Sequence, residues 1–365
     1  MRSRILVIGL LELSVCITAG ADGPSFLSTL HHTTTVASTV PRNGDINPYG
    51  VAVVPVNQGA LVAGNVLVSN FNNSANLQGT GTTIVQISPT GAVKEFANLA
   101  GASLKGDCPG GVGLTTALVA LRSGFVIVGS LPTADGTAAT AQAGCLIVLN
   151  SSGQPVGTIS GHGINGPWDM TAVDMGTGAV LFVTNVFDAV AANGAVVSKG
   201  SVLRIVLSIP FNGTPLASPP FPTIASTFPE RTDPAALVIG PTGLALSADG
   251  RTLFVSDTLT SRIAAIANPI LRNDDAHNGV TVAEGRALKQ PLGLAIAPNG
   301  NILTVNAGNG LMVETTADGK QAGVQFVDVS HSRNGAGTLF GLAIAPGGAG
   351  VYFVDDGNNT LNILR

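Results

Sequence analysis

Short runs of small and β-branched residues recur along this chain, and residues that favour turns separate them. Three segments align closely, at residues 241–257, 291–306 and 340–355. Each pairs a strand such as Gly-Leu-Ala-Leu with a turn of the Asp-Gly or Asn-Gly type and a second strand such as Leu-Phe-Val-Ser-Asp, which is the pattern of a β-hairpin. Repeats of this kind, with a period of about 40 to 50 residues, are typical of β-propeller blades.

Looser copies of the hairpin bring the predicted number of blades to six. They cover residues 47–70, 113–130 and 168–185. A Pro-rich insertion at about 210–241 lengthens the third blade and is expected to form loops. The first strand of most units carries a leading glycine, and Asp169 takes that place in the third unit; the glycines are Gly50, Gly113, Gly243, Gly293 and Gly341.

The last unit is one strand short of a four-stranded blade. Its strands are expected near residues 342–345, 351–354 and 361–364, where the chain stops. The segment Thr33 to Val40 precedes the first blade, is rich in threonine and valine, and has no other obvious partner. We therefore predict an all-β, six-bladed propeller in which this N-terminal strand completes the last blade and covers its open edge.

The repeat resembles a known family. Its pattern of Pro-x-Gly-Leu-Ala, Asp-Gly and Leu-Phe-Val-Ser-Asp, followed by Arg262 and Ile263, is similar to the NHL repeat and to the wider group of gluconolactonase-like six-bladed β-propellers. The resemblance covers blades one and four to six well, and blades two and three poorly. It implies the fold more strongly than the function, because that group contains binding modules, lactonases and lyases on one scaffold.

Composition removes one class of function. Charged residues make up 10% of the 365 residues and the net charge is -4, so the chain has no basic face with which to neutralise phosphates. The sequence therefore argues against nucleic-acid binding. The hydrophobic fraction of 45% fits many short buried strands, and no segment after the first residues is long and apolar enough for a membrane helix.

The first residues have the features of a secretory signal. Arg2 and Arg4 precede an apolar run, and Ala19 and Ala21 are the small residues that a signal peptidase prefers. We expect residues 1–21 to be a signal peptide, residues 22–365 to form one propeller domain, and the protein to be secreted or periplasmic. Glu12 interrupts the apolar run, so an uncleaved anchor is the alternative.

The residues that end the second strands are expected to form a ring at one mouth of the central channel. They are Asn70, Ser130, Asn185, Asp257, Asn306 and Asp355. Oxygen ligands of this kind suit calcium, and the calcium-dependent lactonases that the fold resembles bind their metal in the channel, so Asp257, Asp355 and Asn306 are the candidate ligands. The alternative is that each side chain caps its own turn. No acidic residue lies at 47–50, where those lactonases tend to have a glutamate.

Three further side chains and the two cysteines complete the candidates. His162 and His331 fall in loops on the same rim, where they either bind a ligand or are simply solvated. Trp168 either offers a stacking surface to a ligand or fills the mouth. Cys108 and Cys145 both map to one rim of blade two, so we expect a disulfide in an oxidising compartment.

The pattern identifies no nucleophile and no general base, so the sequence leaves open whether the protein is an enzyme. The leading hypothesis is an exported binding module that holds a small molecule, a glycan or a protein with its channel-mouth loops. The alternative is a calcium-dependent lactonase or lyase. No cofactor is established by the sequence, and calcium is the one that the ring favours.

Overall fold

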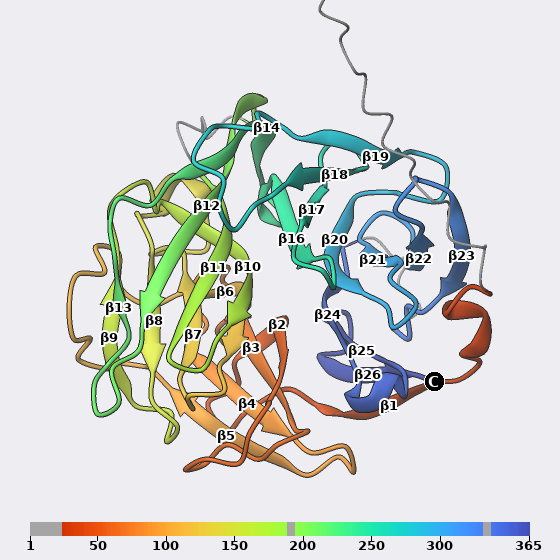
Figure 1. Cartoon of the computed structure of the whole chain (residues 1–365). Coiled ribbons are helices and arrows are strands. Elements are labelled where there is room, and N and C mark those ends of the chain that lie inside the picture. The colour runs from red at the N-terminus through yellow and green to blue at the C-terminus, as the bar shows by residue number, and fades with distance from the viewer. Residues whose placement is uncertain (1–23, 188–193, 331–336) are drawn as a thin grey trace, which may run out of the picture.

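A computed structural model describes residues 24–187, 194–330 and 337–365 (Figure 1). The predicted signal peptide lies outside these residues. Six antiparallel sheets surround a central axis, so the predicted six-bladed propeller is confirmed. None of the helices in the described part of the chain is long and apolar enough to cross a membrane.

Four blades are built from four strands in simple sequence order, the first strand lying innermost. Blade one contains β2 (Ile46–Val53), β3 (Val66–Asn72), β4 (Thr83–Ile87) and β5 (Val93–Asn98). Blade two contains β6 (Leu114–Ala120), β7 (Val126–Ser130), β8 (Cys145–Leu149) and β9 (Pro155–Ile159). Blade four contains β16 (Pro241–Leu246), β17 (Thr252–Asp257), β18 (Arg262–Ala267) and β19 (Val280–Glu284). Blade five contains β20 (Pro291–Ile296), β21 (Ile302–Asn306), β22 (Leu311–Thr315) and β23 (Gln321–Phe326).

Blade three is larger than the others. Its strands are β10 (Gly166–Asp174), β11 (Gly178–Val186), β12 (Val197–Ser208), β13 (Leu216–Ala217), β14 (Thr223–Asp233) and β15 (Leu237–Ile239). The segment 210–241 was expected to form loops, yet it supplies β14, which pairs with the long β12. Proline at both ends of this segment hid a strand of 11 residues from the sequence pattern.

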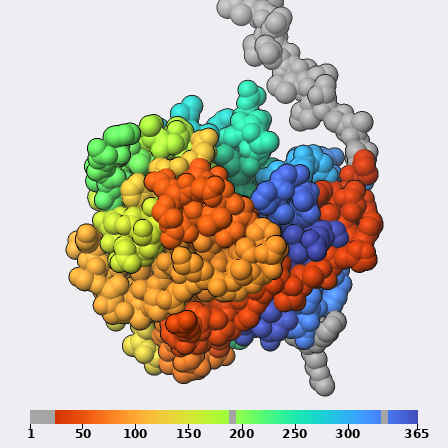
Figure 2. Space-filling view, turned by 90° about the horizontal axis from the view of Figure 1, so that it is seen from below, coloured from red at the N-terminus to blue at the C-terminus, as the bar shows by residue number. Residues whose placement is uncertain are grey.

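The N-terminal strand closes the ring as predicted. In blade six, β24 (Leu339–Ile344), β25 (Val351–Asp355) and β26 (Thr360–Leu364) are joined at the outer edge by β1 (Thr33–Ser38). The pairing of β1 with β26 is antiparallel, with Thr33 opposite Leu364. Figure 2 shows the red N-terminal segment lying against the blue C-terminal blade. The blade edge that would otherwise be unpaired is therefore covered.

A short segment before β1 is bound to blade five. It forms the 3-10 helix η1 (Leu27–Thr29), and the carboxylate of Glu314 on β22 accepts hydrogen bonds from the Ser25 hydroxyl (2.5 Å) and from the backbone N–H groups of Phe26 (2.9 Å) and Leu27 (2.8 Å). The other short helices in the described residues are η2 (Ala138–Thr140) and η4 (Pro346–Gly348). The chain before β1 thus adds contacts to a second blade.

Glycine lets neighbouring inner strands approach closely. A Cβ atom added at Gly243, Gly293 or Gly341 would lie 2.3 Å from a backbone oxygen of the next blade, so no larger residue fits there without movement. The strand register places Gly50 and Asp169 at the same level. In blade two that level is occupied by Ala117, not by Gly113 as expected, because the bulge between Leu114 and Leu118 contains an extra residue.

The two cysteines are joined in blade two. The Sγ atoms of Cys108 and Cys145 are 2.06 Å apart and the Cα atoms 5.2 Å apart. Cys108 lies in the loop that leads into β6, and Cys145 begins β8. The link therefore fastens this long loop to the middle of the blade.

Candidate functional site: the two mouths of the channel

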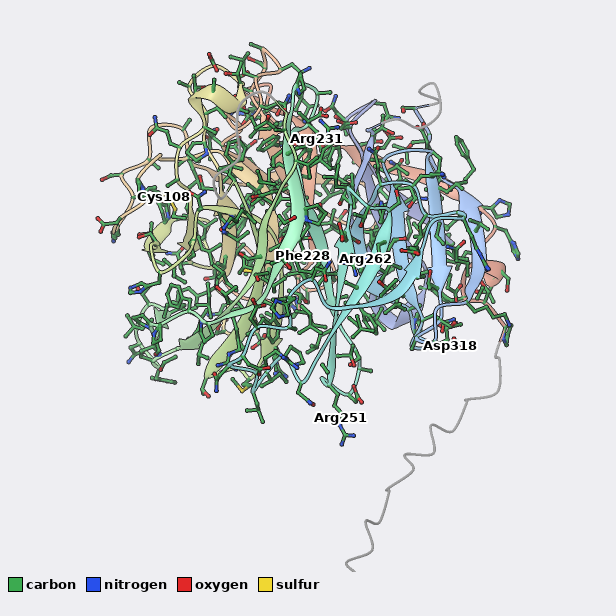
Figure 3. All side chains as sticks on the ribbon, turned by 90° about the horizontal axis from the view of Figure 1, so that it is seen from above. Cys108, Phe228, Arg231, Arg251, Arg262 and Asp318 are labelled. Carbon is green, nitrogen blue, oxygen red and sulfur yellow. A yellow bond between two sulfur atoms is a disulfide. The ribbon has the colours of Figure 1, made fainter. Side chains whose placement is uncertain are left out.

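The inner strands β2, β6, β10, β16, β20 and β24 surround one axial channel. We call the rim where these strands begin the first mouth, and the opposite rim the second mouth. In the side view of Figure 3, Arg231 of blade three lies toward the first mouth, and Arg251, in the turn between β16 and β17, lies at the second. The ring predicted from the sequence belongs to the first mouth.

Ring residues at the first mouth accept hydrogen bonds from the segments that lead into their own blades. Oδ1 of Asn185 accepts hydrogen bonds from the backbone N–H groups of Asn165 (2.7 Å) and Gly166 (3.0 Å). Oδ2 of Asp355 accepts two from Val329 and Ser330, both at 3.0 Å. In blade two, the Ser130 hydroxyl accepts a hydrogen bond from the N–H of Gly113 (2.9 Å) and donates one to the carbonyl of Gly111 (2.8 Å).

Two further ring residues act through their amide nitrogens. Nδ2 of Asn70 donates to the carbonyl of Thr39 (3.1 Å), and Nδ2 of Asn306 donates to the carbonyl of Ala287 (2.7 Å). Both carbonyls lie in the segment leading into the same blade. In five of the six blades the ring side chain therefore fastens the incoming chain, which is a wider structural role than capping of its own turn.

The sixth ring residue forms a buried ion pair that the sequence reading missed. Oδ2 of Asp257 receives hydrogen bonds from Nη2 (2.8 Å) and Nε (3.1 Å) of Arg262. Asp257 is fully buried and Arg262 is almost so. The two residues are directly opposite each other in the β17–β18 hairpin. A hairpin register counted from the turn between them would have revealed the pair.

Blade six gathers carboxyl groups at the first mouth. Burial and, to a smaller extent, the nearby charge of Asp328 together raise the pKa of Asp355 to about 6, although hydrogen bonds from backbone N–H groups lower it in part. Burial also raises the pKa of Asp356 to about 7, with added repulsion from Asp355 and Asp328. These groups hold protons more strongly than ordinary carboxyl groups because they are close together and poorly solvated.

Four aromatic side chains fill the centre of the first mouth, and we call them the aromatic plug: Tyr49, Phe71, Trp168 and Phe340. The ring of Tyr49 stacks on those of Phe340 and Phe71, with centroids 3.9 and 4.6 Å apart, and lies edge-on to Trp168 at 5.8 Å. Trp168 is only 3% exposed. Trp168 therefore packs inside the protein, where it and Phe340 also line a small cavity of about 80 Å³.

Calcium normally binds six to eight oxygen atoms. In the described part of the chain, three ring residues have an Oδ1 atom that is buried without a hydrogen-bond partner: Asn70, Asp257 and Asn306. These unpaired oxygen atoms are the feature of the ring that favours a cation. Only one of these atoms belongs to a carboxylate, and Arg262 neutralises its charge. Residues 24–187, 194–330 and 337–365 contain no group of three or more His, Cys, Asp or Glu side chains suited to a metal. The unpaired ring oxygens among these residues are therefore fewer than the six to eight that calcium normally binds.

His162 does not join the ring. His162 is exposed, and its ring packs edge-on against Phe221, with centroids 5.2 Å apart. Phe221 precedes β14 in the outer part of blade three, so His162 contacts the blade's periphery and not the channel. His331 lies outside the described residues.

The second mouth opens into a cavity of about 590 Å³. Its wall follows the inner strands from their middles to their ends, and all six inner strands contribute. Most of the lining side chains are apolar; examples from blades one, four and five are Val51, Val53, Leu246, Leu294 and Ile296. The channel is thus closed at one end by the aromatic plug and hollow at the other.

Asp169 places an ionisable group in the wall of this cavity. It lies on β10 at the level of the inner-strand glycines, lines the cavity and keeps part of its surface accessible. Its Oδ1 accepts a hydrogen bond from the N–H of Met170 (2.7 Å), and the N–H of Leu244 in the next blade also bonds to the carboxyl group. Burial raises the pKa of Asp169 to about 8, although these two backbone groups lower it in part.

Comparison with solved structures shows the same architecture. The chain is similar to a gluconolactonase of Xanthomonas campestris, with 14% identity, a TM-score of 0.57, and coverage of 91% of this chain and 88% of that one. It is also similar to the PQQ-bound aldose sugar dehydrogenase of Streptomyces coelicolor (17% identity, TM-score 0.51, 91% and 97% covered). A third similar structure is the calcium-binding protein regucalcin of Agrobacterium tumefaciens (12% identity, TM-score 0.50, 90% and 92% covered).

No family model and no curated protein matches the sequence. At identities this low the structural similarity shows the fold alone. The resemblance inferred from the repeat is confirmed at that level. The chain has the fold of the gluconolactonase-like six-bladed β-propellers.

Proposed function

We propose that this protein is a binding propeller that holds a small, largely apolar molecule in the axial channel. The molecule enters through the second mouth. The observation that carries the proposal is the cavity of about 590 Å³, enclosed by the inner strands of all six blades. Sites for small molecules usually measure about 300–1,000 Å³ and combine an apolar wall with a few polar groups. The position differs from the earlier expectation of a ligand at the first mouth, which the aromatic plug fills.

The proposal is tested by blocking the second mouth. Val53 and Leu246 line the cavity on blades one and four, on opposite sides of the ring. The double variant Val53→Trp/Leu246→Trp should lose the binding of a neutral fluorescent probe, N-phenyl-1-naphthylamine, by at least about tenfold. The matched control is Val93→Trp/Val280→Trp, which places two tryptophans at exposed positions of the outermost strands of the same two blades.

Saturable binding with one probe per protein, retained in the control and lost in the blocked variant, supports the proposal. Circular dichroism and the melting temperature establish that each variant is folded. Equal binding by the blocked and the control variants would place the probe elsewhere on the molecule. Absence of binding to the parent protein, tested with the panel of probes described below, would remove the proposal altogether.

The second candidate is a calcium-dependent lactonase. The observation that favours it is the set of unpaired oxygens at Asn70, Asp257 and Asn306. Two of the similar structures are described as a gluconolactonase and a calcium-binding protein. The oxygens are too few and too weakly charged for a strong site, so this candidate ranks second, and the calcium experiment in the Discussion tests it directly.

A further inference from the structure

The channel contains a carboxyl group without any group of opposite charge. Among the described residues that line the cavity, the ionisable ones are Asp169 and Asp174, both on β10. The linings from β2, β6, β16, β20 and β24 contribute no ionisable side chain. Asp174 ends β10 at the second mouth, where Arg122 lies beside it at 3.6 Å. Asp169 lies five residues earlier on the same strand, and no cation among the cavity-lining residues accompanies it.

An ionised carboxylate in such a place is poorly stabilised. The neighbouring strands β6 and β16 contribute Leu118 and Leu244 to the wall. The polar Thr116 of β6 donates a hydrogen bond from its hydroxyl to the carbonyl of Trp168. The two backbone N–H groups that bond to Asp169 supply dipoles and no net charge. Taking a carboxylate out of water into apolar surroundings is costly unless a cation pairs with it.

The repeat shows that the propeller does not need this carboxyl group. At the same level of the inner strand, four blades have glycine, at Gly50, Gly243, Gly293 and Gly341. Blade two has Ala117, which has no side-chain acceptor either. Five junctions between inner strands are therefore formed without the hydrogen bond that Asp169 makes to Leu244. A role in folding alone does not account for an acid at the sixth.

We infer that the ligand of the channel carries a protonated amine on an apolar body, and that the carboxylate of Asp169 binds this ammonium group. The inference rests on the proposed function and names the chemical class of its ligand. An ammonium group supplies the missing charge and donates a charge-assisted hydrogen bond. The apolar body of the ligand occupies the cavity between Asp169 and the second mouth, where the wall offers leucine, isoleucine and valine.

The test compares three probes of the same shape: 2-(1-naphthyl)ethylamine, 2-(1-naphthyl)ethanol and 1-naphthylacetate. Each competes with N-phenyl-1-naphthylamine at pH 8.5. The amine should bind about 30-fold more tightly than the alcohol, because removing one partner of a buried charge pair typically costs at least this much, and the anion should bind most weakly. The variant Asp169→Asn keeps a carbonyl oxygen for Leu244 and loses the charge, so the amine and the alcohol should then bind within about threefold.

The matched control is Asp249→Asn, which makes the same change of charge in the exposed turn beside Arg251 at the second mouth. It should retain the preference for the amine. If the alcohol equals the amine in the parent protein, or if Asp169→Asn keeps the preference, the inference is wrong while the binding function stands. If none of the probes binds, the proposed function fails as well. Unchanged affinity for the neutral probe shows that the channel of the Asn variant is intact.

The pH dependence of amine binding distinguishes an acid that binds the ligand from an acid with a purely structural role. Because burial raises the pKa of Asp169 to about 8, its carboxyl group must lose a proton before it pairs with an amine. Amine affinity should rise about tenfold per pH unit from pH 6 to pH 8 and then level off until the amine itself loses its proton near pH 10. The alcohol should show no such rise, and neither should the amine with Asp169→Asn. A flat profile for the amine in the parent protein would contradict the inference.

Discussion

The two mouths of the channel are built from the same six repeats and differ in the size of a few inner side chains. At the first mouth, Tyr49, Trp168 and Phe340 precede the level of the inner-strand glycines and meet across the axis. Toward the second mouth the inner strands carry smaller residues, such as Val53 on β2 and Leu246 on β16, and a cavity remains. Which end of a propeller is open therefore depends on where along the inner strands its aromatic residues are placed.

The mouths differ as well in how polar groups are satisfied. At the first mouth, side chains such as Asn185 and Asp355 each bond to the segment that leads into their own blade. In the cavity that opens at the second mouth, Asp169 has backbone partners and no cation among the lining residues. A polar side chain that recurs in every blade and forms its hydrogen bonds within its own blade indicates a structural role. An acid that departs from the repeat and faces a cavity is the better starting point for ligand chemistry.

Truncation of the aromatic plug should produce the largest effect. Replacing a buried Trp by Ala removes many packing contacts and leaves a void, so Trp168→Ala should lower the free energy of unfolding by about 3–5 kcal/mol. The control Leu246→Ala, at the open mouth, should cost less than about 2 kcal/mol because its side chain is already partly exposed. Urea unfolding of both variants measures the difference. Equal losses would mean that the two mouths are packed alike.

Breaking the buried ion pair should have the next largest effect. Arg262→Met leaves the Asp257 carboxylate buried without its cation, which should cost about 3 kcal/mol at neutral pH. The double variant Asp257→Asn/Arg262→Met removes both charges and should recover part of that loss. Chemical denaturation of the three proteins forms the test. A double variant less stable than the single one would show that the pair does not act as a pair.

The fold was largely predictable from the sequence because each blade repeats a local pattern. The hairpins gave the number of blades, and counting strands in the last unit led to Thr33–Val40, of which the structure uses Thr33–Ser38. The leading residue of blade two was misassigned because an extra residue in the bulge after Leu114 changes the count without changing the hydrophobic pattern. The strand β14 was missed because its flanking prolines resemble a loop.

The candidate site was less predictable, because its properties depend on contacts between blades. The positions of Asp257 and Asp355 in the ring follow from the repeat, whereas their partners come from a hairpin register and from incoming loops. Closure of the first mouth requires aromatic residues of blades one, three and six to meet, which no local pattern reveals. Asp169 was visible as a departure from glycine, yet its meaning needed the cavity beside it.

Calcium should have the smallest effect, and it separates the two candidate functions. A ligand that binds only the folded protein raises the free energy of unfolding by RT ln(1 + [L]/Kd), which is about 2.7 kcal/mol at a hundredfold excess over Kd. A micromolar calcium site would therefore raise the melting temperature clearly at millimolar calcium.

We expect no shift, because one carboxylate oxygen at Asp257 and two amide oxygens form an incomplete donor set next to the guanidinium of Arg262. The control is the double variant Asp257→Asn/Asp355→Asn. Its starting stability is lower because Arg262 loses its partner, so the melting temperature of each protein is compared with and without calcium. A rise in melting temperature with calcium that disappears in this double variant would reopen the first mouth as a metal site and favour the lactonase over the binding propeller.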